Sequence, residues 1–324
     1  MNFDQAMIFT HITEKAAIAT LPWIGNGDKN KADDAAVQEM RRVLNNSNIN
    51  GEIVIGEGEI DNAPMLYIGE KVGKGGPEID IAVDPIEGTR MTALGQSNAV
   101  CVLAAGKKDS LLKAPDMYME KLVVNSLAKD HIDINLPIEE NIKKVSSVLQ
   151  KKIEDMVITI LDKPRHHHVI QKIRNLGAKV FLIPDGDVIA SIQICMQNMP
   201  GDIMYGIGGA PEGVISAAAV HSLGGNMQAK LIPRNKVKGA NLENDKISLE
   251  EIKRCKELNL KTESKLLLSD LVTSSSVLCA VTGITKGDIL DGVSVKENMV
   301  KVDTLLIIGE TKSIHRLTSQ YELN

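Results

Sequence analysis

Aromatic side chains are scarce in this sequence of 324 residues: one Trp, four Tyr and three Phe make up only 2% of it. Proteins that bind single-stranded nucleic acid commonly stack the bases on aromatic rings. Non-specific binding to nucleic acid also needs a basic face, whereas this chain has a formal net charge of −5. The composition therefore argues against a nucleic-acid partner, and the core has to be built from aliphatic residues.

Cysteine is also rare, and Cys101, Cys195, Cys255 and Cys279 are far apart with no Cys-x-x-Cys pair. Neither a zinc cluster nor a disulfide framework is predicted, and a reducing compartment is favoured. No stretch approaches the ~18 apolar residues that a membrane helix requires. The first residues lack the basic and apolar segments of a signal peptide. We therefore expect a cytoplasmic protein that does not span a membrane.

The order of the expected elements predicts an α/β fold. In the first half, a helix over residues 3–20 ends before Pro22, and a second helix covers about residues 33–44. In the second half, strands and helices alternate, which predicts a mostly parallel sheet flanked by helices. We expect an N-terminal lobe over residues 1–155 and a C-terminal lobe over residues 156–324. The expected strands are 52–55, 79–83, 99–105, 156–161, 178–183, 203–205 and 304–308, and the later helices are 165–176, 188–196 and 211–223.

Carboxylates at the ends of expected strands are the main functional signal. Asp84 and Glu87 follow the strand over residues 79–83, Glu57 and Glu59 flank a glycine after another strand, and Asp33 opens the second helix. Carboxylates gathered from several strand ends supply the oxygen ligands that Mg²⁺ and Mn²⁺ prefer. Taken singly, each of these groups is better explained as a turn residue, a helix cap or a solvated charge. Spacing alone does little to change that preference.

The segment Asp84-Pro-Ile-Glu-Gly-Thr89 resembles the Asp-Pro-Ile/Leu-Asp/Glu-Gly-Thr/Ser motif of the lithium-sensitive, metal-dependent phosphatase superfamily. That superfamily includes inositol monophosphatases and fructose-1,6-bisphosphatases, and it implies a layered α/β/α/β/α sugar-phosphatase sandwich. The fuller pattern resembles class II (GlpX-type) fructose-1,6-bisphosphatases across essentially the whole chain. Its further motifs are Gly27-Asp-Lys-Asn30 with Asp33, Gly56-Glu-Gly-Glu-Ile-Asp61, Ala63-Pro-Met65 and Gly208-Gly-Ala-Pro-Glu-Gly213.

The resemblance implies a role for each matching residue. Thr89 matches a catalytic threonine, and Mn²⁺, or alternatively Mg²⁺, is the implied cofactor. A homodimer or homotetramer is implied as well. The implied metal ligands are Asp33, Glu57, Asp84, Glu87 and Glu212, and the implied substrate-binding residues are Lys29, Glu87, Gly88, Thr89, Tyr118, Lys163, Arg165, Asp185, Gly186, Asp187 and Gly209. Most metal ligands would then belong to the N-terminal lobe, and the C-terminal lobe would carry Glu212 and most of the substrate-binding residues.

The function implied by the resemblance is hydrolysis of the 1-phosphate of fructose 1,6-bisphosphate in gluconeogenesis. A sedoheptulose-1,7-bisphosphatase or an enzyme with both activities remains an alternative, because both substrates present the same phosphate and keto-sugar end. A non-catalytic sugar-phosphate sensor is the alternative from another class. An inositol monophosphatase is disfavoured, since Glu212 stands where that family has Trp-Asp.

Two further patterns are less informative about function. The run His166-His167-His168 cannot converge on one ion from a helix, where successive side chains are ~100° apart. Gly206-Ile-Gly-Gly209 lacks the third spaced glycine of a dinucleotide-binding loop. We expect this glycine segment to form a phosphate-binding turn before Glu212.

Overall fold

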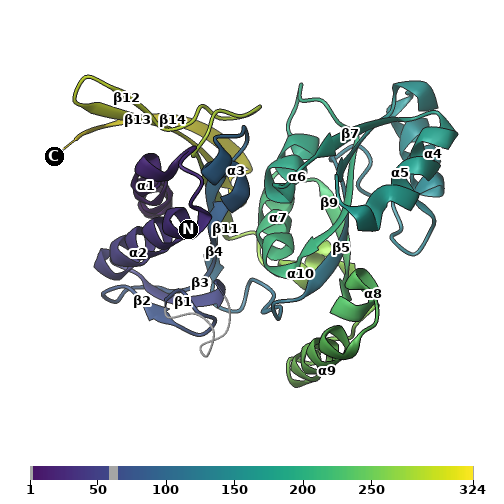
Figure 1. Ribbon diagram of the computed structural model, residues 1–324, viewed down its shortest axis with the longest axis horizontal. Helices are drawn as coiled ribbons and strands as arrows, with labels where there is room; N and C mark the ends of the chain where they lie inside the picture. Colours follow the sequence, from purple (N-terminus) through teal and green to yellow (C-terminus); the bar gives the residue numbers. More distant parts are fainter. Residues whose placement is uncertain (1–2, 58–64, 324) are drawn as a thin grey trace. The chain divides into compact units, whose positions relative to one another are not determined.

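The computed structural model describes residues 3–57 and 65–323, and the chain divides into two compact units (Figure 1). Unit 1 comprises Met1–Leu111 with Ser274–Asn324, and unit 2 comprises Leu112–Thr273. This division differs from the expected boundary at residue 155. Strand β5 (Tyr118–Val124) pairs with strands later in the chain, whereas β11 (Val277–Gly283) pairs with β4 (Val100–Lys107) and returns the C-terminal segment to the first sheet.

In the described residues, unit 1 contains an eight-stranded mixed sheet. Its order is β12-β13-β11-β4-β3-β1-β2, with β14 pairing to β13. Only the β1–β3 pair is parallel among the described strand pairs of this sheet. The remaining strands are β1 (Asn50–Ile55), β2 (Lys71–Val72), β3 (Glu78–Glu87), β12 (Ser294–Lys296), β13 (Met299–Ile308) and β14 (Ser313–Glu322).

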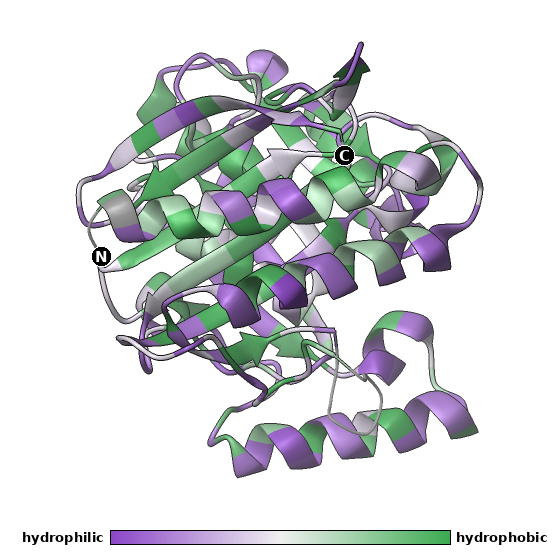
Figure 2. Ribbon diagram, turned by 90° about the vertical axis from the view of Figure 1, so that its left-hand side faces the viewer, coloured by the Kyte–Doolittle hydropathy of each residue, from purple (hydrophilic) through white to green (hydrophobic). Residues whose placement is uncertain are grey.

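Helices α1 (Phe3–Ala19) and α2 (Lys29–Asn46) pack on this sheet. Along both helices hydrophobic and hydrophilic residues alternate, and the strands behind them are mainly hydrophobic (Figure 2). Phe9, Met40 and Leu44 are completely buried against sheet residues such as Ile81 and Leu103. Apolar burial at the periodicity of a helix therefore accounts for the first expected helix, which the structure confirms. Short helices η1 (Leu21–Trp23) and α3 (Thr89–Leu94) complete unit 1 in the described residues.

Unit 2 is built on a six-stranded sheet in the order β10-β9-β5-β8-β6-β7. The pairs β6–β7 and β6–β8 are parallel, but the pairs of β5 with β8 and β9, and of β9 with β10, are antiparallel. The expected mostly parallel sheet is therefore wrong for this unit. The strands are β6 (Val157–Leu161), β7 (Lys179–Ile183), β8 (Ile203–Gly209), β9 (Asn226–Ile232) and β10 (Leu266–Leu267), besides β5.

The two faces of this sheet are covered by different helices. Leu122 and Val124 of β5 pack in one apolar cluster with α4 (Ile138–Leu149) and α5 (His167–Leu176). Because strand side chains alternate, Met119 and Lys121 point to the other face, which is covered by α6 (Asp187–Cys195) and α7 (Ala210–Ser222). The remaining helices are η2 (Ile153–Asp155), η3 (Pro164–His166), α8 (Arg234–Lys238), α9 (Leu242–Glu257) and α10 (Leu268–Leu271).

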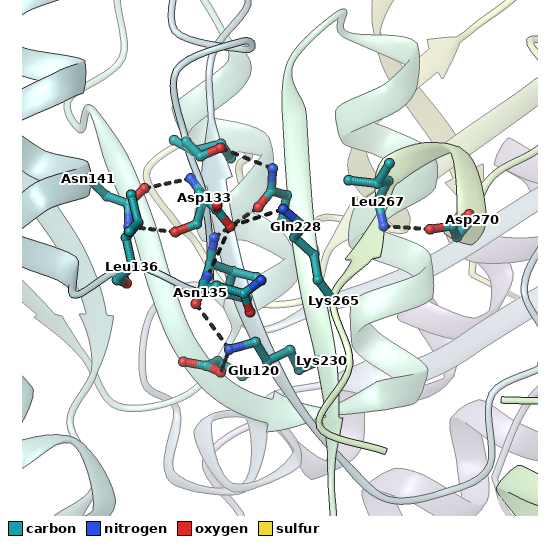
Figure 3. Close-up of polar contacts among 12 residues, drawn as sticks. Glu120, Asp133, Asn135, Leu136, Asn141, Gln228, Lys230, Lys265, Leu267 and Asp270 are labelled. Atoms are coloured by element: carbon teal, nitrogen blue, oxygen red, sulfur yellow. Dashed lines mark hydrogen bonds and ion pairs between the residues drawn. The ribbon is translucent and has the colours of Figure 1, made fainter. Parts of the chain in front are cut away.

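Polar contacts join the segment before α4 to β9 (Figure 3). The Gln228 side chain accepts a hydrogen bond from the Ile134 backbone N–H at 2.9 Å and donates to the Ile132 carbonyl at 3.1 Å. Lys265 pairs with Asp133 at 3.1 Å. The two Gln228 contacts satisfy backbone groups of a loop that lies against the sheet.

Two further expectations need correction. The second helix begins at Lys29, four residues before Asp33, and Asp28 caps it by accepting from the Lys31 N–H at 3.1 Å. Asp33 therefore lies inside the helix and does not open it. Gly206 to Gly209 form the end of β8 and pair with β5, so they are strand residues and not a turn. Gly208 and Gly209 have no side chains, which lets neighbouring groups approach this strand closely.

The expected α/β class is confirmed, because each unit has a mixed sheet with packed helices. None of the helices in the described part of the chain is both long enough and apolar enough to cross a membrane.

Candidate active site

A bulge at the end of β3 places Asp84 and Glu87 on the same face of the sheet. Asp84 is opposite Val102 and Glu87 is opposite Val100, so β3 carries one extra residue between these pairs. In a regular strand, residues three positions apart point to opposite faces. The extra residue in the bulge shifts Glu87 by one position, so that it points to the same face as Asp84. Pro85, which has no N–H for a strand partner, is tolerated at such a bulge. The expected loop after residue 83 is thus a bulged strand end.

Gly88 and Thr89 follow directly. Gly88 is the N-cap of α3, with φ of 90° in the left-handed region that favours glycine. Thr89 begins the helix, and its hydroxyl donates to the Ile86 carbonyl at 3.2 Å. With its proton used in this way, the Thr89 oxygen is left as an acceptor.

Glu57 belongs to the same edge of the sheet as Asp84. Strands β1 and β3 are parallel neighbours, with Ile55 opposite Ala82. Each carboxylate comes two residues after this pair, so both stand where parallel strands end, the usual position of sites in α/β folds. Glu59, also singled out from the sequence, lies outside the described residues.

Asp33 and Lys29 are both on α2, which packs against β3 and α3. Asp33 is half-buried, and burial, with a smaller effect from the neighbouring Asp34 charge, raises its pKa. Lys29 is exposed. In the described residues no group of three or more His, Cys, Asp or Glu side chains is already arranged to hold a metal ion. The structure therefore brings Asp84, Glu87, Gly88 and Thr89 together, and places Glu57 and Asp33 on adjoining elements.

In unit 2, Arg165 is held by two contacts. Its Nε donates to the Ile207 carbonyl at 2.7 Å, and its guanidinium carbon lies 5.5 Å from the centre of the Tyr118 ring. Burial lowers the pKa of Arg165, whereas Tyr118, Asp187 and Asp185 act in the opposite direction. Expected substrate-binding residues from three separate segments thus meet around this guanidinium.

Lys163 and Asp185 form an ion pair at 2.6 Å, and both side chains are partly exposed. The sequence predicted that each would bind substrate, but it did not predict that they would contact one another. Gly186 follows in a left-handed conformation with φ of 88° and caps α6. The turn directs Asp187 into the first turn of α6, where it is buried.

Asp187 and Glu212 lie near a buried lysine that the sequence analysis did not single out. Lys121 forms an ion pair with Asp187 Oδ2 and donates to the Gly209 carbonyl at 3.2 Å. Glu212 is in the first turn of α7, and burial raises its pKa while Lys121 lowers it. Nothing in the sequence around Lys121 indicated that this lysine is buried or that it contacts Asp187.

One property of the Asp187 and Glu212 carboxylates fits a divalent cation. Asp187 Oδ1 and Glu212 Oε2 are inaccessible to solvent and have no hydrogen-bond partner in the described part of the chain. Such buried acceptors are costly unless a donor or a cation satisfies them. Hard oxygen ligands are the donors that Mg²⁺ and Mn²⁺ take. The chemistry of Glu212 therefore agrees with its expected role as a ligand.

His166 contacts Ile207, the residue whose carbonyl accepts a hydrogen bond from Arg165. Its Nδ1 lies 2.8 Å from the Leu161 carbonyl, and its Nε2 accepts from the Ile207 N–H at 2.8 Å. These two contacts define a neutral ring that donates through Nδ1, which is a structural role and not metal binding. Ile207 thus bonds to Arg165 through its carbonyl and to His166 through its N–H.

The titration of His166 gives a first testable result. Burial, and next the Arg165 charge, lower its pKa from 6.5 to about 4. Because the fold favours the neutral ring, its contribution to stability is complete above pH 6.5 and is lost as the pH falls toward 4. His166→Gln should therefore flatten the fall in the thermal midpoint of the metal-free protein between pH 7 and pH 5. Parallel curves for the variant and wild type would contradict this assignment.

Comparison with known proteins gives consistent matches over the whole chain. The family described as bacterial fructose-1,6-bisphosphatase, glpX-encoded, matches residues 4–321. A Haemophilus influenzae protein named fructose-1,6-bisphosphatase class 2 is 54% identical, covering 100% of this chain and 98% of its own length. An Escherichia coli K12 protein named fructose-1,6-bisphosphatase 1 class 2 is 53% identical, covering 100% of this chain and 97% of its own.

More distant relatives carry a broader name. A Trichodesmium erythraeum protein named D-fructose 1,6-bisphosphatase class 2/sedoheptulose 1,7-bisphosphatase is 42% identical, covering 93% of this chain and 91% of its own length. Among solved structures, an inositol monophosphatase of Thermotoga maritima covers 79% of this chain and 100% of its own, with a TM-score of 0.39 and 14% identity.

Proposed function

The chain belongs to the bacterial, glpX-encoded fructose-1,6-bisphosphatase family, and on that premise we propose that it hydrolyses the 1-phosphate of fructose 1,6-bisphosphate. The products are fructose 6-phosphate and inorganic phosphate. The observation that carries the proposal is the register of β3, because it turns Asp84 and Glu87 to one face beside the Thr89 helix start. A phosphatase that depends on divalent metal needs such carboxylates beside a hydroxyl.

The proposed ligands are Asp33, Glu57, Asp84, Glu87 and Glu212. These groups would hold a divalent cation, which would supply neutralisation of phosphate charge and a more nucleophilic bound water. The β3 register supports this choice for Asp84 and Glu87, because the bulge turns both residues to one face of the sheet. The finer choice of Mn²⁺ over Mg²⁺ belongs to this proposal.

Thr89 orients the attacking water or the phosphate. Its hydroxyl proton is donated to the Ile86 carbonyl, so the oxygen can accept a hydrogen bond from water. Direct attack by Thr89 remains the second route, although it would need a base to take up that proton. Lys29, Gly88 and Thr89 would surround the reacting phosphate.

A second set of residues binds the remainder of the substrate in this proposal. Arg165 and Lys163 bind the second phosphate, because a guanidinium can hold a phosphate bidentately. Asp185 and Asp187 accept hydrogen bonds from sugar hydroxyls, with Tyr118, Gly186 and Gly209 beside them. The existing Lys163–Asp185 contact would then loosen or rotate as substrate enters.

Phosphate release tests the proposal directly. Protein stripped by a chelator should release almost no phosphate from fructose 1,6-bisphosphate, and Mn²⁺ or Mg²⁺ should restore the activity. The fructose product should retain the phosphate at position 6, which a coupled assay for fructose 6-phosphate measures. Folded protein that releases no phosphate with either metal would favour the non-catalytic sensor.

Replacing Thr89 separates chemistry from binding. Thr89→Ala should lower kcat by about 10²-fold, which a misplacement of about 1 Å at the reacting centre can cause, with a small change in KM. Thr89→Ser keeps the hydroxyl and should retain much of the activity. Steady-state kinetics with saturating Mn²⁺ measure both, and unchanged turnover of the Ala variant would remove Thr89 from the mechanism.

A second candidate activity is hydrolysis of sedoheptulose 1,7-bisphosphate. It is favoured by the Trichodesmium erythraeum relative, which carries both names at 42% identity. The ratio of kcat/KM for the two bisphosphates decides whether this protein has one activity or both. A role in gluconeogenesis, a cytoplasmic location and a homodimer or homotetramer are further parts of the proposal, which the oligomer mass and localisation would test.

A further inference from the structure

Lys121 is buried to 0% exposure in the middle of unit 2. A lysine without water is costly unless its ammonium is paired and hydrogen-bonded. Here the ammonium contacts Asp187 Oδ2, and it donates to the Gly209 carbonyl at 3.2 Å. One buried cation therefore connects the first turn of α6 with the residue that caps α7.

Two glycines of β8 leave room for these groups. A Cβ on Gly208 would lie 2.3 Å from Asp187 Oδ2 and 2.9 Å from Lys121 Nζ. A Cβ on Gly209 would lie 1.9 Å from Glu212 Oε2. No side chain at either position is compatible with the present arrangement of Lys121, Asp187 and Glu212.

The contacts around Lys121 satisfy only some of the carboxylate oxygens of Asp187 and Glu212. Lys121 contacts one oxygen of Asp187, while Asp187 Oδ1 and Glu212 Oε2 have no hydrogen-bond partner within the described residues. A cluster that served stability alone would be expected to satisfy all of its members, because partly satisfied buried networks are unfavourable. Residues that break this rule are typical of functional sites.

We propose that Lys121 is a positioning residue for the phosphatase site. It holds Asp187 and the Gly209 carbonyl in place, so that Asp187 Oδ1 is presented to the sugar and Glu212 Oε2 to the cation. Lys121 acts through these groups and does not touch the substrate itself. The inference rests on the proposed function, since it specifies how one half of that site is oriented.

Lys121→Met is the first variant, because Met fills similar space without charge. We expect KM for fructose 1,6-bisphosphate to rise about 10-fold or more, and the Mn²⁺ concentration for half-activation to rise similarly. Loss of groups that orient ligands typically costs 10- to 100-fold. A merely structural role would reduce the amount of folded enzyme, and so the apparent kcat, without changing KM.

Lys230→Met is the matched control. Lys230 lies on the neighbouring strand β9, opposite Glu120 of β5, and its side chain is 17% exposed. It is 3.8 Å from Glu120 and donates to the Ile134 carbonyl at 3.1 Å (Figure 3). It therefore shares the sheet and an acidic partner, but not Asp187 or Glu212. KM and Mn²⁺ activation of this variant should match the wild type.

Lys121→Met alone leaves Asp187 buried without its cation, which can prevent folding. The double variant Lys121→Met/Asp187→Asn removes both charges and should fold, as its thermal midpoint and far-UV spectrum will show. If Lys121 acts through Asp187, the increase in KM of the double variant should equal that of Asp187→Asn alone and not the product of the two single effects.

Unchanged KM and Mn²⁺ activation in Lys121→Met, or multiplied effects in the double variant, would overturn the positioning role. A wild-type protein that hydrolyses no bisphosphate would instead overturn the proposed function. The two failures are distinguishable, because the first requires an active wild type.

Discussion

Glu212→Gln is expected to lower phosphate release by about 10²-fold or more without lowering the thermal midpoint of the metal-free protein. The variant keeps the shape of the side chain but removes a charge that the proposal assigns to cation binding. Groups that only orient metal ligands already contribute 10- to 100-fold, so loss of a ligand should cost at least as much.

The stability part of this result has a separate cause. Burial raises the pKa of Glu212, the Lys121 charge lowers it, and the Asp187 and Asp116 carboxylates raise it. Because the net effect disfavours the charged form, removing that charge should leave the melting temperature of the metal-free variant the same or higher. Scanning calorimetry and a phosphate assay at several Mn²⁺ concentrations measure the two effects.

The matched control is Glu243→Gln. Glu243 is also in the first turn of a helix, α9, but is exposed. Its replacement should change neither activity nor the Mn²⁺ requirement. Activity of Glu212→Gln within 2-fold of the wild type would show that Glu212 does not bind the essential metal. The unsatisfied Glu212 Oε2 would then have no explanation.

Gly209→Ala is expected to lower kcat/KM by about 10²-fold, since a displacement near 1 Å at a reacting centre can have that effect. The added Cβ would lie 1.9 Å from Glu212 Oε2, so the carboxylate or the strand must move. Gly209 has φ of −72° and ψ of 147°, which alanine adopts readily. Steric displacement of Glu212 is therefore the only expected cause.

Gly206→Ala provides the control from the same strand. Its added Cβ would have ordinary contacts, the nearest at 3.5 Å to the Met204 Cε. Steady-state kinetics should show near wild-type activity for this variant and a higher Mn²⁺ requirement for Gly209→Ala. Equal activity of the two variants would contradict the proposed position of the Glu212 carboxylate.

Local patterns predicted many of the elements. The helix before Pro22, the strand leading into Asp84 and the helix ending at Gly177 agree with the structure to within a few residues. Each depends on local signals, such as apolar spacing, a proline or a C-terminal glycine. The same reasoning failed at Asp33, because Asp28, five residues earlier, caps the helix N-terminus instead.

The candidate site also has features that the sequence predicted and features that it did not. The motif from Asp84 to Thr89 was recognisable as a string, and with the other motifs it indicated the family that the comparisons confirm. The pairing of Lys163 with Asp185, and the support of Arg165 by His166 through Ile207, were not predictable. Those contacts join residues about 20 to 40 positions apart, and no local periodicity specifies which distant side chain will be the partner.

By itself, the sequence determined the α/β class, the ends of many elements and the set of chemically competent residues. These depend on interactions within a few positions of the chain. Only the tertiary structure decided that β5 is antiparallel to β8, that a bulge turns Asp84 and Glu87 to one face, and that Lys121 is buried beside Asp187. Strand register and burial result from competition among distant segments for the same core, and a one-residue change in register reverses every side chain.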